Sequence, residues 1–283
     1  MTVGITSKEL YGFVVSSLIG MKDIQSDLVP KGKINVHSGK YRTRMDYYPD
    51  KNKDKIADIE IGTTKSKHKY FRLGLYPSKF GPGDFEHFKL LLELLLPEFN
   101  YPLLFKTARV SYIELAADSR SEMAHSFVPF RPRCNYSYIY KEQDGSYGST
   151  YLGSKLSALK FCIYDKHRQL LAKNLPAPHK THTRIEVRLR HTGLSPSELL
   201  EKMDNPFKKL EIADLQKARN ASKDKVWQNF LDLCLEVGSA KALALHPKKR
   251  KLYMSMLRVA ASWWWKPNHI WLKLPQALSV IEP

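Results

Sequence analysis

The chain has 283 residues, enough for about two domains at ~150 residues each. Its formal net charge of +18 favours a polyanionic partner, above all nucleic acid and more weakly an anionic membrane surface. Three scattered cysteines exclude a disulfide framework and a paired-cysteine zinc site. The apolar patch at residues 13–19 is too short to span a bilayer, so we expect a cytoplasmic protein without a membrane partner.

Basic side chains gather in three separate blocks. Residues 31–55 carry eight basic and three acidic side chains, and residues 160–190 carry eight and two. Residues 241–258 carry six basic and no acidic ones, centred on Lys248, Lys249, Arg250 and Lys251. Separate blocks predict several contacts along a nucleic-acid backbone, with the C-terminal cluster as a DNA contact. The competing interpretation is that these blocks are ordinary solvated surface, because any chain with this net charge must place many lysines on its surface.

The first half of the chain predicts mostly strands. Residues 2–18 indicate a helix, and residues 34–37 and 41–48 a hairpin around Ser38-Gly39. Alternation predicts strands at 57–62 and 70–76, and an apolar helix follows at 85–96, with Asp84 as its cap and Pro97 as its end. A strong strand is expected at 108–117.

The second half changes from strands to helices. Strands at 136–140 and 149–153 flank a turn at Asp144-Gly145, and two more are expected at 159–165 and 183–190. A helix opens after Ser195, and further helices are predicted at 225–236 and 247–265. We therefore predict an α+β fold with a central, mostly antiparallel sheet. Residues 1–194 form its α+β domain, with a core from about residue 30, and residues 195–283 form a helical C-terminal region.

Three of the predicted strands carry charged groups where a core strand would be apolar. In the strand at 108–117 and its extension, the period of two places Glu114 and Asp118 on one face, about 13 Å apart. They cannot share one ion unless the chain bends after Ala117, so Glu114 is the better ligand candidate. Asp58, in an earlier strand, is interpreted as a surface residue.

The strand at 159–165 places a tyrosine between lysines. Lys160, Cys162, Tyr164 and Lys166 share one face, while Phe161 and Ile163 are expected to be buried. Two lysines beside one tyrosine predict a positive field, which favours the phenolate and attracts phosphate.

The strand at 183–190 alternates cleanly. Arg184, Glu186, Arg188 and Arg190 lie opposite Ile185, Val187 and Leu189. A glutamate among three arginines is either part of an ion-pair ladder or a metal ligand beside phosphate-binding groups.

A tyrosine, carboxylates and many basic groups suit phosphodiester transfer through a phosphotyrosine. The phenol attacks phosphorus, a divalent ion polarises the phosphate, and basic side chains offset the developing charge. Carboxylate oxygens suit Mg²⁺ or Mn²⁺. No two of the ten histidines are separated by a single residue, so the paired-histidine metal motif of the best-known tyrosine nickases is absent. His179 and His182 are interpreted as solvent or phosphate contacts.

These motifs resemble the replication initiation factor family. The matching segments are YLGSKLSALKFCIYDK at 151–166, HTRIEVRLR at 182–190 and VSYIELAAD at 110–118, together with the C-terminal LHPKKRKLYMSML and WWWKPNHIW. The resemblance covers residues 30–272. The family comprises rolling-circle plasmid initiators that act in trans and related filamentous-phage initiators.

The resemblance implies rolling-circle initiation, in which one strand of an origin is nicked, a 5′-phosphotyrosine forms and a 3′-hydroxyl is freed for the polymerase. By matched position, Tyr164 is the nucleophile and Glu114 and Glu186 bind metal or activate attack, with Asp118 or Asp165 as further candidates. Lys166 and Arg188 face phosphate, and Lys160, Arg184, Arg190 and the cluster at 248–251 contact DNA. Origin DNA, the single-stranded product, a host helicase and a second copy of the chain are the expected partners.

Structural interpretations of these residues, and two other functions, stay open. Tyr164 is one of 15 tyrosines, and a half-buried strand tyrosine is ordinarily structural. The row Tyr136, Tyr138 and Tyr140 either stacks extruded bases or packs across strands. The three tryptophans at 263–265 are interpreted as filling the core of the helical C-terminal region. Gly153-Ser154 is interpreted as a turn that ends a strand. A non-catalytic DNA-binding replication or regulatory protein is the second hypothesis, and an RNA-binding module the third.

Overall fold

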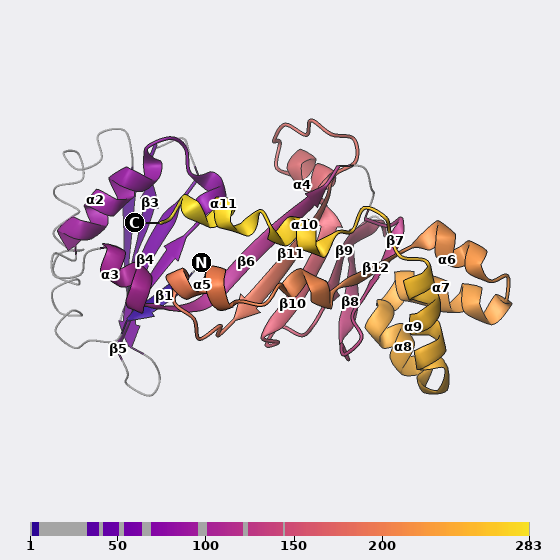
Figure 1. Ribbon diagram of the computed structural model, residues 1–283. Helices are drawn as coiled ribbons and strands as arrows, with labels where there is room; N and C mark the ends of the chain where they lie inside the picture. Colours follow the sequence, from indigo (N-terminus) through magenta and orange to yellow (C-terminus); the bar gives the residue numbers. More distant parts are fainter. Residues whose placement is uncertain are drawn as a thin grey trace. The chain divides into compact units, whose positions relative to one another are not determined.

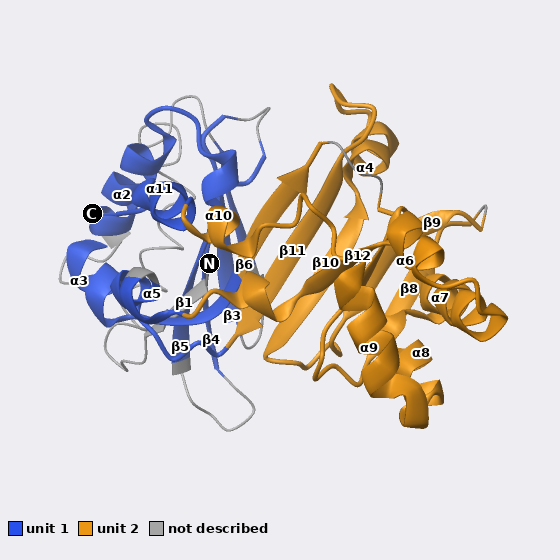
Figure 2. Ribbon diagram, turned by 45° about the vertical axis from the view of Figure 1, so that its right-hand side comes forward, with its two compact units in different colours: residues 1–113, 191–203, 273–283 blue, residues 114–190, 204–272 orange. Residues whose placement is uncertain are grey.

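The computed structural model describes residues 2–5, 33–39, 42–50, 54–63, 69–95, 101–120, 124–143 and 145–282. The chain forms two compact units (Figure 2): unit 1 comprises residues 1–113, 191–203 and 273–283, and unit 2 comprises residues 114–190 and 204–272. Each unit combines antiparallel strands with helices, which confirms the predicted α+β class.

The sheet of unit 1 contains six neighbouring strands. Their order is β2 (Lys33–Gly39), β3 (Arg42–Tyr48), β4 (Ala57–Thr63), β5 (Lys69–Leu75), β1 (Thr2–Ile5) and the beginning of β6 (Arg109–Ser119). Each neighbouring pair is antiparallel. Alternation of side chains buries one face, including Met45, Ile59 and Leu73, which lie opposite one another across three strands.

Short helices complete unit 1. They are η1 (Pro77–Lys79), α2 (Asp84–Leu95), α3 (Tyr101–Thr107), α5 (Pro196–Lys202) and α11 (Leu274–Ser279). Phe88 of α2 packs on Tyr47 of β3 with ring centroids 5.4 Å apart. A capping box of Ser195 and Glu198 begins α5, as expected for a helix that opens after Ser195.

The other face of β4 carries buried carboxylates. Asp58 and Glu60 are each only 3% exposed, so the interpretation of Asp58 as a surface residue is wrong. Asp58 accepts hydrogen bonds from Tyr76 at 2.8 Å and from Lys55 at 3.1 Å, which compensate its burial. Gly74 lies opposite on β5, where a Cβ would come within 2.9 Å of the Asp58 carboxylate. Because glycine has no side chain, position 74 leaves room for the Asp58 carboxylate.

Unit 2 continues with the rest of β6 and four further strands of a sheet (Figure 1). The order is β6, β11 (Thr183–Arg190), β10 (Leu159–Asp165), β9 (Tyr147–Leu152) and β8 (Ser137–Lys141). The apolar face of this sheet, which includes Phe161, Ile163 and Val187, packs on Phe127 and Phe207. The opposite, polar face is the one that carries Tyr164 and Glu186.

A helical module and a small sheet make up the rest of unit 2. The sheet pairs β7 (Phe127–Phe130) with β12 (Glu211–Asp214). The module contains α6 (Leu215–Ala221), α7 (Lys225–Val237), α8 (Ser239–Leu245), η3 (Pro247–Lys249) and α9 (Arg250–Val259), grouped in Figure 1 beside β7 and β12. Trp227, Phe230 and Leu257 form its core. The remaining helices are α4 (Lys166–Ala172), η2 (Pro206–Lys209) and α10 (Pro267–Trp271).

Most predicted elements are confirmed, and some are not. The helix predicted at 2–18 is wrong at Thr2–Ile5, which is β1 because it pairs with β5 and β6, and residues 6–18 lie outside the described residues. Asp144, of the predicted β8–β9 turn, also lies outside them. The helix predicted at 247–265 ends at Val259. β7, β12 and α4 were not predicted.

The units do not divide at residue 194. Residues 204–272 group with the sheet of 114–190, and residues 195–203 and 273–283 group with unit 1. A helical stretch read along the sequence is therefore not a separate unit. The assignment of nicking to 1–194 and of DNA binding to 195–283 stays a prediction.

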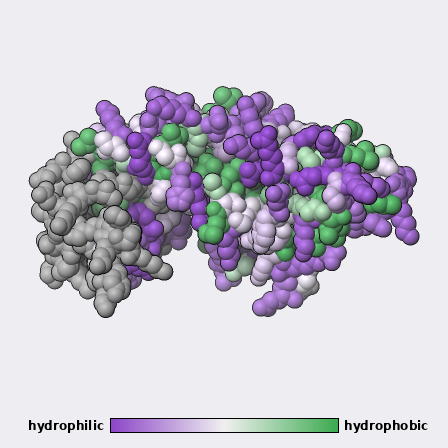
Figure 3. All heavy atoms as spheres, turned by 90° about the horizontal axis from the view of Figure 1, so that it is seen from below, coloured by the Kyte–Doolittle hydropathy of each residue, from purple (hydrophilic) through white to green (hydrophobic). Residues whose placement is uncertain are grey.

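The visible face in Figure 3 is mostly hydrophilic, with hydrophobic residues scattered among the polar ones. Within the described ranges, none of the helices combines the length and the apolar character that crossing a bilayer requires.

Gly153, after β9, provides a test of the packing of unit 2. Its φ is +102°, and an added Cβ would lie 2.8 Å from the Leu159 carbonyl oxygen. We expect Gly153→Ala to lower the free energy of unfolding by about 2–4 kcal/mol, measured by urea denaturation. Gly145→Ala is the matched control, because its φ is +77° with no atom within 4 Å, and it should cost about 1 kcal/mol. Equal losses would contradict this packing.

Candidate functional site

Tyr164 and Glu186 meet on the polar face of unit 2. Tyr164 lies on β10 and Glu186 on the neighbouring strand β11. The antiparallel register places Glu186 opposite Cys162, two residues before Tyr164 and on the same face of the sheet. The Tyr164 hydroxyl donates a hydrogen bond to Glu186 Oε1 at 2.6 Å. Both residues are buried, at 8% and 6% exposure. The sequence-predicted nucleophile is therefore in direct contact with one of the predicted carboxylates.

Arg188 links Glu186 to the second predicted glutamate. Its Nη2 donates to Glu186 Oε2 at 2.6 Å, and its Nε forms an ion pair with Glu114 Oε2 at 2.8 Å. The pKa of Arg188 is raised: burial would lower it, but the charges of Glu114 and Glu186 and the hydrogen bond outweigh burial. Tyr164, Glu186, Arg188 and Glu114 thus form one connected chain of contacts.

Asp118 has an arginine partner of its own. Arg184 donates two hydrogen bonds to its carboxylate, at 2.7 and 2.8 Å, and Nε2 of His182 lies 3.4 Å from Oδ1. Burial would raise the pKa of Asp118, yet the hydrogen bonds and charge of Arg184 lower it. The arginines of β11 therefore pair with the carboxylates of β6 four residues apart, as an ion-pair ladder does.

A cavity of about 680 Å³ opens over Tyr164. Its lining includes Tyr164, Glu186 and Arg188 on the floor strands and Arg168 and Gln169 on α4. The β8–β9 hairpin contributes further lining residues, which are Tyr140, Glu142, Ser146, Tyr147, Gly148, Ser149 and Tyr151. The phenol and its carboxylate partner are buried against protein but face a space that can admit a phosphodiester.

The predicted preference of Tyr164 for the phenolate form is wrong. The pKa of Tyr164 is raised, first by burial and then by the hydrogen bond to Glu186 and by its charge, so the protonated phenol is favoured. The main charges that act on Tyr164 are those of Glu186, which raises its pKa, and Arg184, which lowers it. Lys160 Nζ lies over the Tyr151 ring at 4.4 Å, and Lys166 begins α4, where it donates to Gln169 at 2.5 Å. Cross-strand partners, which spacing along one strand cannot reveal, decide the field.

The three predicted metal ligands do not form one site. Glu114 and Glu186 share the guanidinium of Arg188, and Asp118 binds Arg184. Across the described parts of the chain, no three His, Cys, Asp or Glu side chains are grouped as a metal site would require. Asp165, the further candidate, caps α4 by accepting from the Arg168 N–H at 3.1 Å. In this arrangement Arg184 and Arg188 offset the charges of the three carboxylates.

The tyrosines in β8 and just before it are divided between two roles. Tyr138 stacks on Tyr151 across the strands, with centroids 4.5 Å apart and planes 12° apart. Tyr136 and Tyr140 are 51% and 53% exposed, and only Tyr140 lines the cavity. The cross-strand interpretation holds for Tyr138, whereas an exposed ring at the cavity is available for contact with a ligand.

The predicted DNA contacts are spread over unit 2. Arg190 is exposed at the end of β11, and Lys248, Lys249 and Lys251 are exposed around the start of α9. Arg250 instead donates to the Pro132 carbonyl at 3.0 Å and joins the module to the loop after β7.

His182, interpreted from the sequence as a solvent or phosphate contact, lies beside Asp118, with its Nε2 3.4 Å from Oδ1. Sequence reasoning missed Arg168, because α4 was not predicted. The Ile-Tyr-Asp-Lys end of β10 carried a usable signal, since Asp165 is a helix cap three residues before Arg168.

Comparison with solved structures gives a distant structural likeness. No protein-family model matches the chain, and no curated protein sequence matches it. Among solved structures, the chain is similar to a rolling-circle replication initiator protein from Geobacillus stearothermophilus, with 9% sequence identity and a TM-score of 0.37. The match covers 74% of this chain and 86% of that one.

The Asp118–Arg184 pair predicts a pH dependence of stability. The carboxylate has a folded-state pKa below its ordinary 3.8, so its contribution is present above about pH 4 and is lost as the pH falls through the folded-state value. We expect Asp118→Asn to be less stable than the wild type at neutral pH, with a difference that shrinks in acid. Urea denaturation at several pH values measures this. Arg184→Gln should show the same decline, and a pH-independent difference would contradict the account.

Proposed function

We propose that this chain is a rolling-circle replication initiator that nicks one strand of an origin through a 5′-phosphotyrosine at Tyr164. The observation that carries the proposal is the 2.6 Å hydrogen bond between Tyr164 and Glu186 on the floor of a cavity. The net charge of +18 supports a polyanionic substrate. The resemblance of residues 110–118, 151–166 and 182–190 to replication initiation factors supports the same reaction.

The contacts suggest how attack would proceed. Tyr164 Oη attacks phosphorus while its proton passes to Glu186 Oε1, which already accepts the hydrogen bond. The new bond joins the tyrosine oxygen to the 5′-phosphate, the bond to the 3′-oxygen breaks, and that oxygen takes a proton from water. Arg188, which holds Glu186, lines the same cavity and can offset charge on the phosphate oxygens. A raised phenol pKa makes this base necessary.

The remaining expectations belong to the same proposal. The Mg²⁺ or Mn²⁺ requirement stays a prediction, and no step here uses the ion. Duplex origin DNA and the single-stranded product are the proposed partners, and the exposed Arg190, Lys248, Lys249 and Lys251 are proposed backbone contacts. A host helicase and a homodimer are proposed from the family resemblance, and a cytoplasmic location from the composition of the chain.

Tyr164→Phe is the first test. The variant should form no covalent adduct with a nicked origin oligonucleotide, because it lacks the attacking oxygen, and it should bind duplex DNA as the wild type does. Denaturing gel electrophoresis detects the adduct, and a mobility shift measures binding.

Tyr140→Phe and Tyr151→Phe are matched controls, since both rings line the same cavity. They should keep the adduct. An adduct in Tyr164→Phe would assign the nucleophile to another tyrosine. A wild-type chain that binds DNA and never forms an adduct would instead support the non-catalytic origin binder.

Glu186→Gln and Glu114→Gln are the second test. Loss of the proton acceptor, or of the charge that positions Arg188, should lower the nicking rate by ~10²-fold or more for Glu186→Gln and less for Glu114→Gln, with DNA binding retained. Asp165→Asn is the control, because the carboxylate lines the cavity but caps α4, and an amide oxygen also caps. Nicking rates of supercoiled plasmid, with and without EDTA, give both the effect and the ion requirement. Unchanged rates in both glutamine variants would remove these residues from the site.

A further inference from the structure

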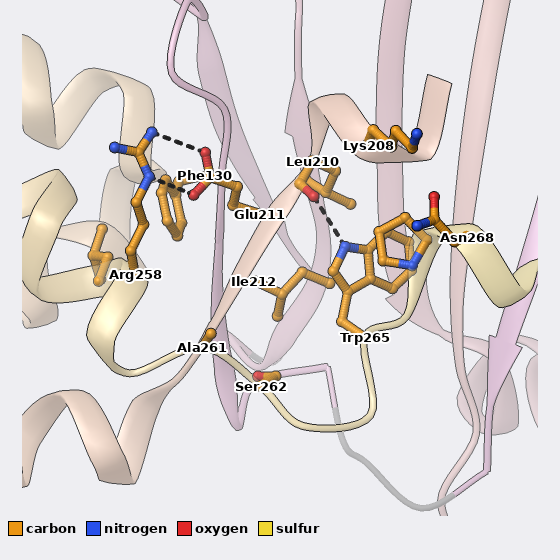
Figure 4. Close-up of a pocket in the computed structure, with 12 residues that line it drawn as sticks. Phe130, Lys208, Leu210, Glu211, Ile212, Arg258, Ala261, Ser262, Trp265 and Asn268 are labelled. Carbon is orange, nitrogen blue, oxygen red and sulfur yellow. Dashed lines mark hydrogen bonds and ion pairs between the residues drawn. The ribbon is translucent and has the colours of Figure 1, made fainter. Parts of the chain in front are cut away.

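Unit 2 contains a second cavity, of about 310 Å³, that shares no lining residue with the one over Tyr164. It lies along β12, the chain after α9 and the start of α10 (Figure 4). Apolar side chains of Phe130, Leu210, Ile212 and Leu257 line it together with the ring of Trp265. Such a surface suits a ligand with an apolar or aromatic part.

Trp265 is a fixed wall of this cavity. Its indole N–H donates to the Leu210 carbonyl at 2.9 Å, as Figure 4 shows, and its ring meets Phe207 edge to face at 6.0 Å. A ring held in this way loses little conformational freedom when a ligand stacks on it. It therefore differs from its neighbour Trp263, which is 65% exposed and does not line the cavity.

Ser262 adds a buried polar group without a partner. The residue is 7% exposed and lines the cavity, and among the described residues its hydroxyl has no hydrogen-bond partner. Its backbone N–H is already paired with the Ile212 carbonyl at 2.9 Å. The hydroxyl oxygen itself is almost fully enclosed by protein, so it lies behind the wall of the cavity rather than at its surface.

The mouth of the cavity is polar and carries positive charge. Lys208 and Asn268 are exposed lining residues, and no ion pair involves Lys208 among the described residues. Arg258 also lines the cavity, but Glu211 holds it with hydrogen bonds of 2.7 and 3.0 Å (Figure 4). The ammonium of Lys208 is thus the cation available to an anionic ligand.

We propose that this cavity binds a nucleotide, with its base against the Trp265 ring and its phosphate beside Lys208. A base presents a flat face to the indole and both donors and acceptors at its edge, which match the donor and the acceptor of the exposed Asn268 amide. An apolar ligand would make no use of the Asn268 amide, and a ligand without an anion would make no use of Lys208. The nucleotide is either free or part of a single strand, and the two sources share this chemistry.

Binding to the purified full chain tests the proposal. The probes are deoxynucleoside monophosphates, by titration calorimetry, and a short single-stranded oligonucleotide carrying 5-iodouracil, by anisotropy and by ultraviolet crosslinking. We expect the crosslink to map to Trp265. Lys208→Ala should weaken the interaction about tenfold, as expected for one lost charge-assisted hydrogen bond, and Asn268→Ala should also weaken it. Both side chains are exposed, so both variants should fold, which circular dichroism checks.

Lys209→Ala is the matched control, because Lys209 is the adjacent exposed lysine of η2 and does not line the cavity. It removes the same charge and should change affinity much less. Lys208-dependent binding of the monophosphates identifies a free nucleotide, and the same dependence with the oligonucleotide alone identifies a strand. Equal effects of Lys208→Ala and Lys209→Ala, a crosslink at Trp263 in place of Trp265, or no binding of either probe would overturn the proposal. Binding requires no cleavage, so the result is independent of Tyr164.

Discussion

The hydrogen bond from the buried Tyr164 hydroxyl to the buried Glu186 carboxylate sets the conditions for the rest of the polar face of unit 2. A carboxylate at 6% exposure needs compensation, and Arg188 provides it on the second oxygen. Arg188 is in turn held by Glu114, so β6, β11 and β10 are joined by alternating charges. Burial raises the pKa of Tyr164 most, and the hydrogen bond to Glu186 raises it further, so the protonated phenol is favoured. The hydrogen bond also places a proton acceptor where an attacking tyrosine would need one.

The sequence predicted which residues share this face, because side-chain alternation along a strand is a local property. Alternation places Tyr164, Glu114 and Glu186 on the polar faces of their strands, and the resemblance to replication initiation factors makes them site candidates. The pairing partners could not be predicted in the same way. The contact of Arg188 with Glu114 joins residues 74 positions apart, and the charge that acts on Tyr164 comes from β11 rather than from the lysines of its own strand.

The secondary structure follows the same rule: local sequence patterns predicted some elements, whereas elements that depend on pairing with distant residues were not predicted. Strong alternation predicted β3, β4, β10 and β11, and the cap at Ser195 predicted the start of α5. Thr2–Ile5 was misread as helix because its strand depends on pairing with β5 and β6. The cavity beside Trp265 assembles residues from Phe130 to Asn268, and no short motif could have shown it. The three tryptophans at 263–265 were interpreted as filling the core, and the structure divides them: Trp264 and Trp265 pack inward while Trp263 is exposed.

The central claim is that the Tyr164 oxygen becomes bonded to DNA. The most direct measurement is tandem mass spectrometry of the protein trapped on a single-stranded origin oligonucleotide, after digestion of both protein and DNA. The account predicts a phosphonucleotide on the peptide that contains Tyr164, attached at that residue. A modification at a different tyrosine, on a chain whose Tyr164 peptide is recovered unmodified, would contradict it.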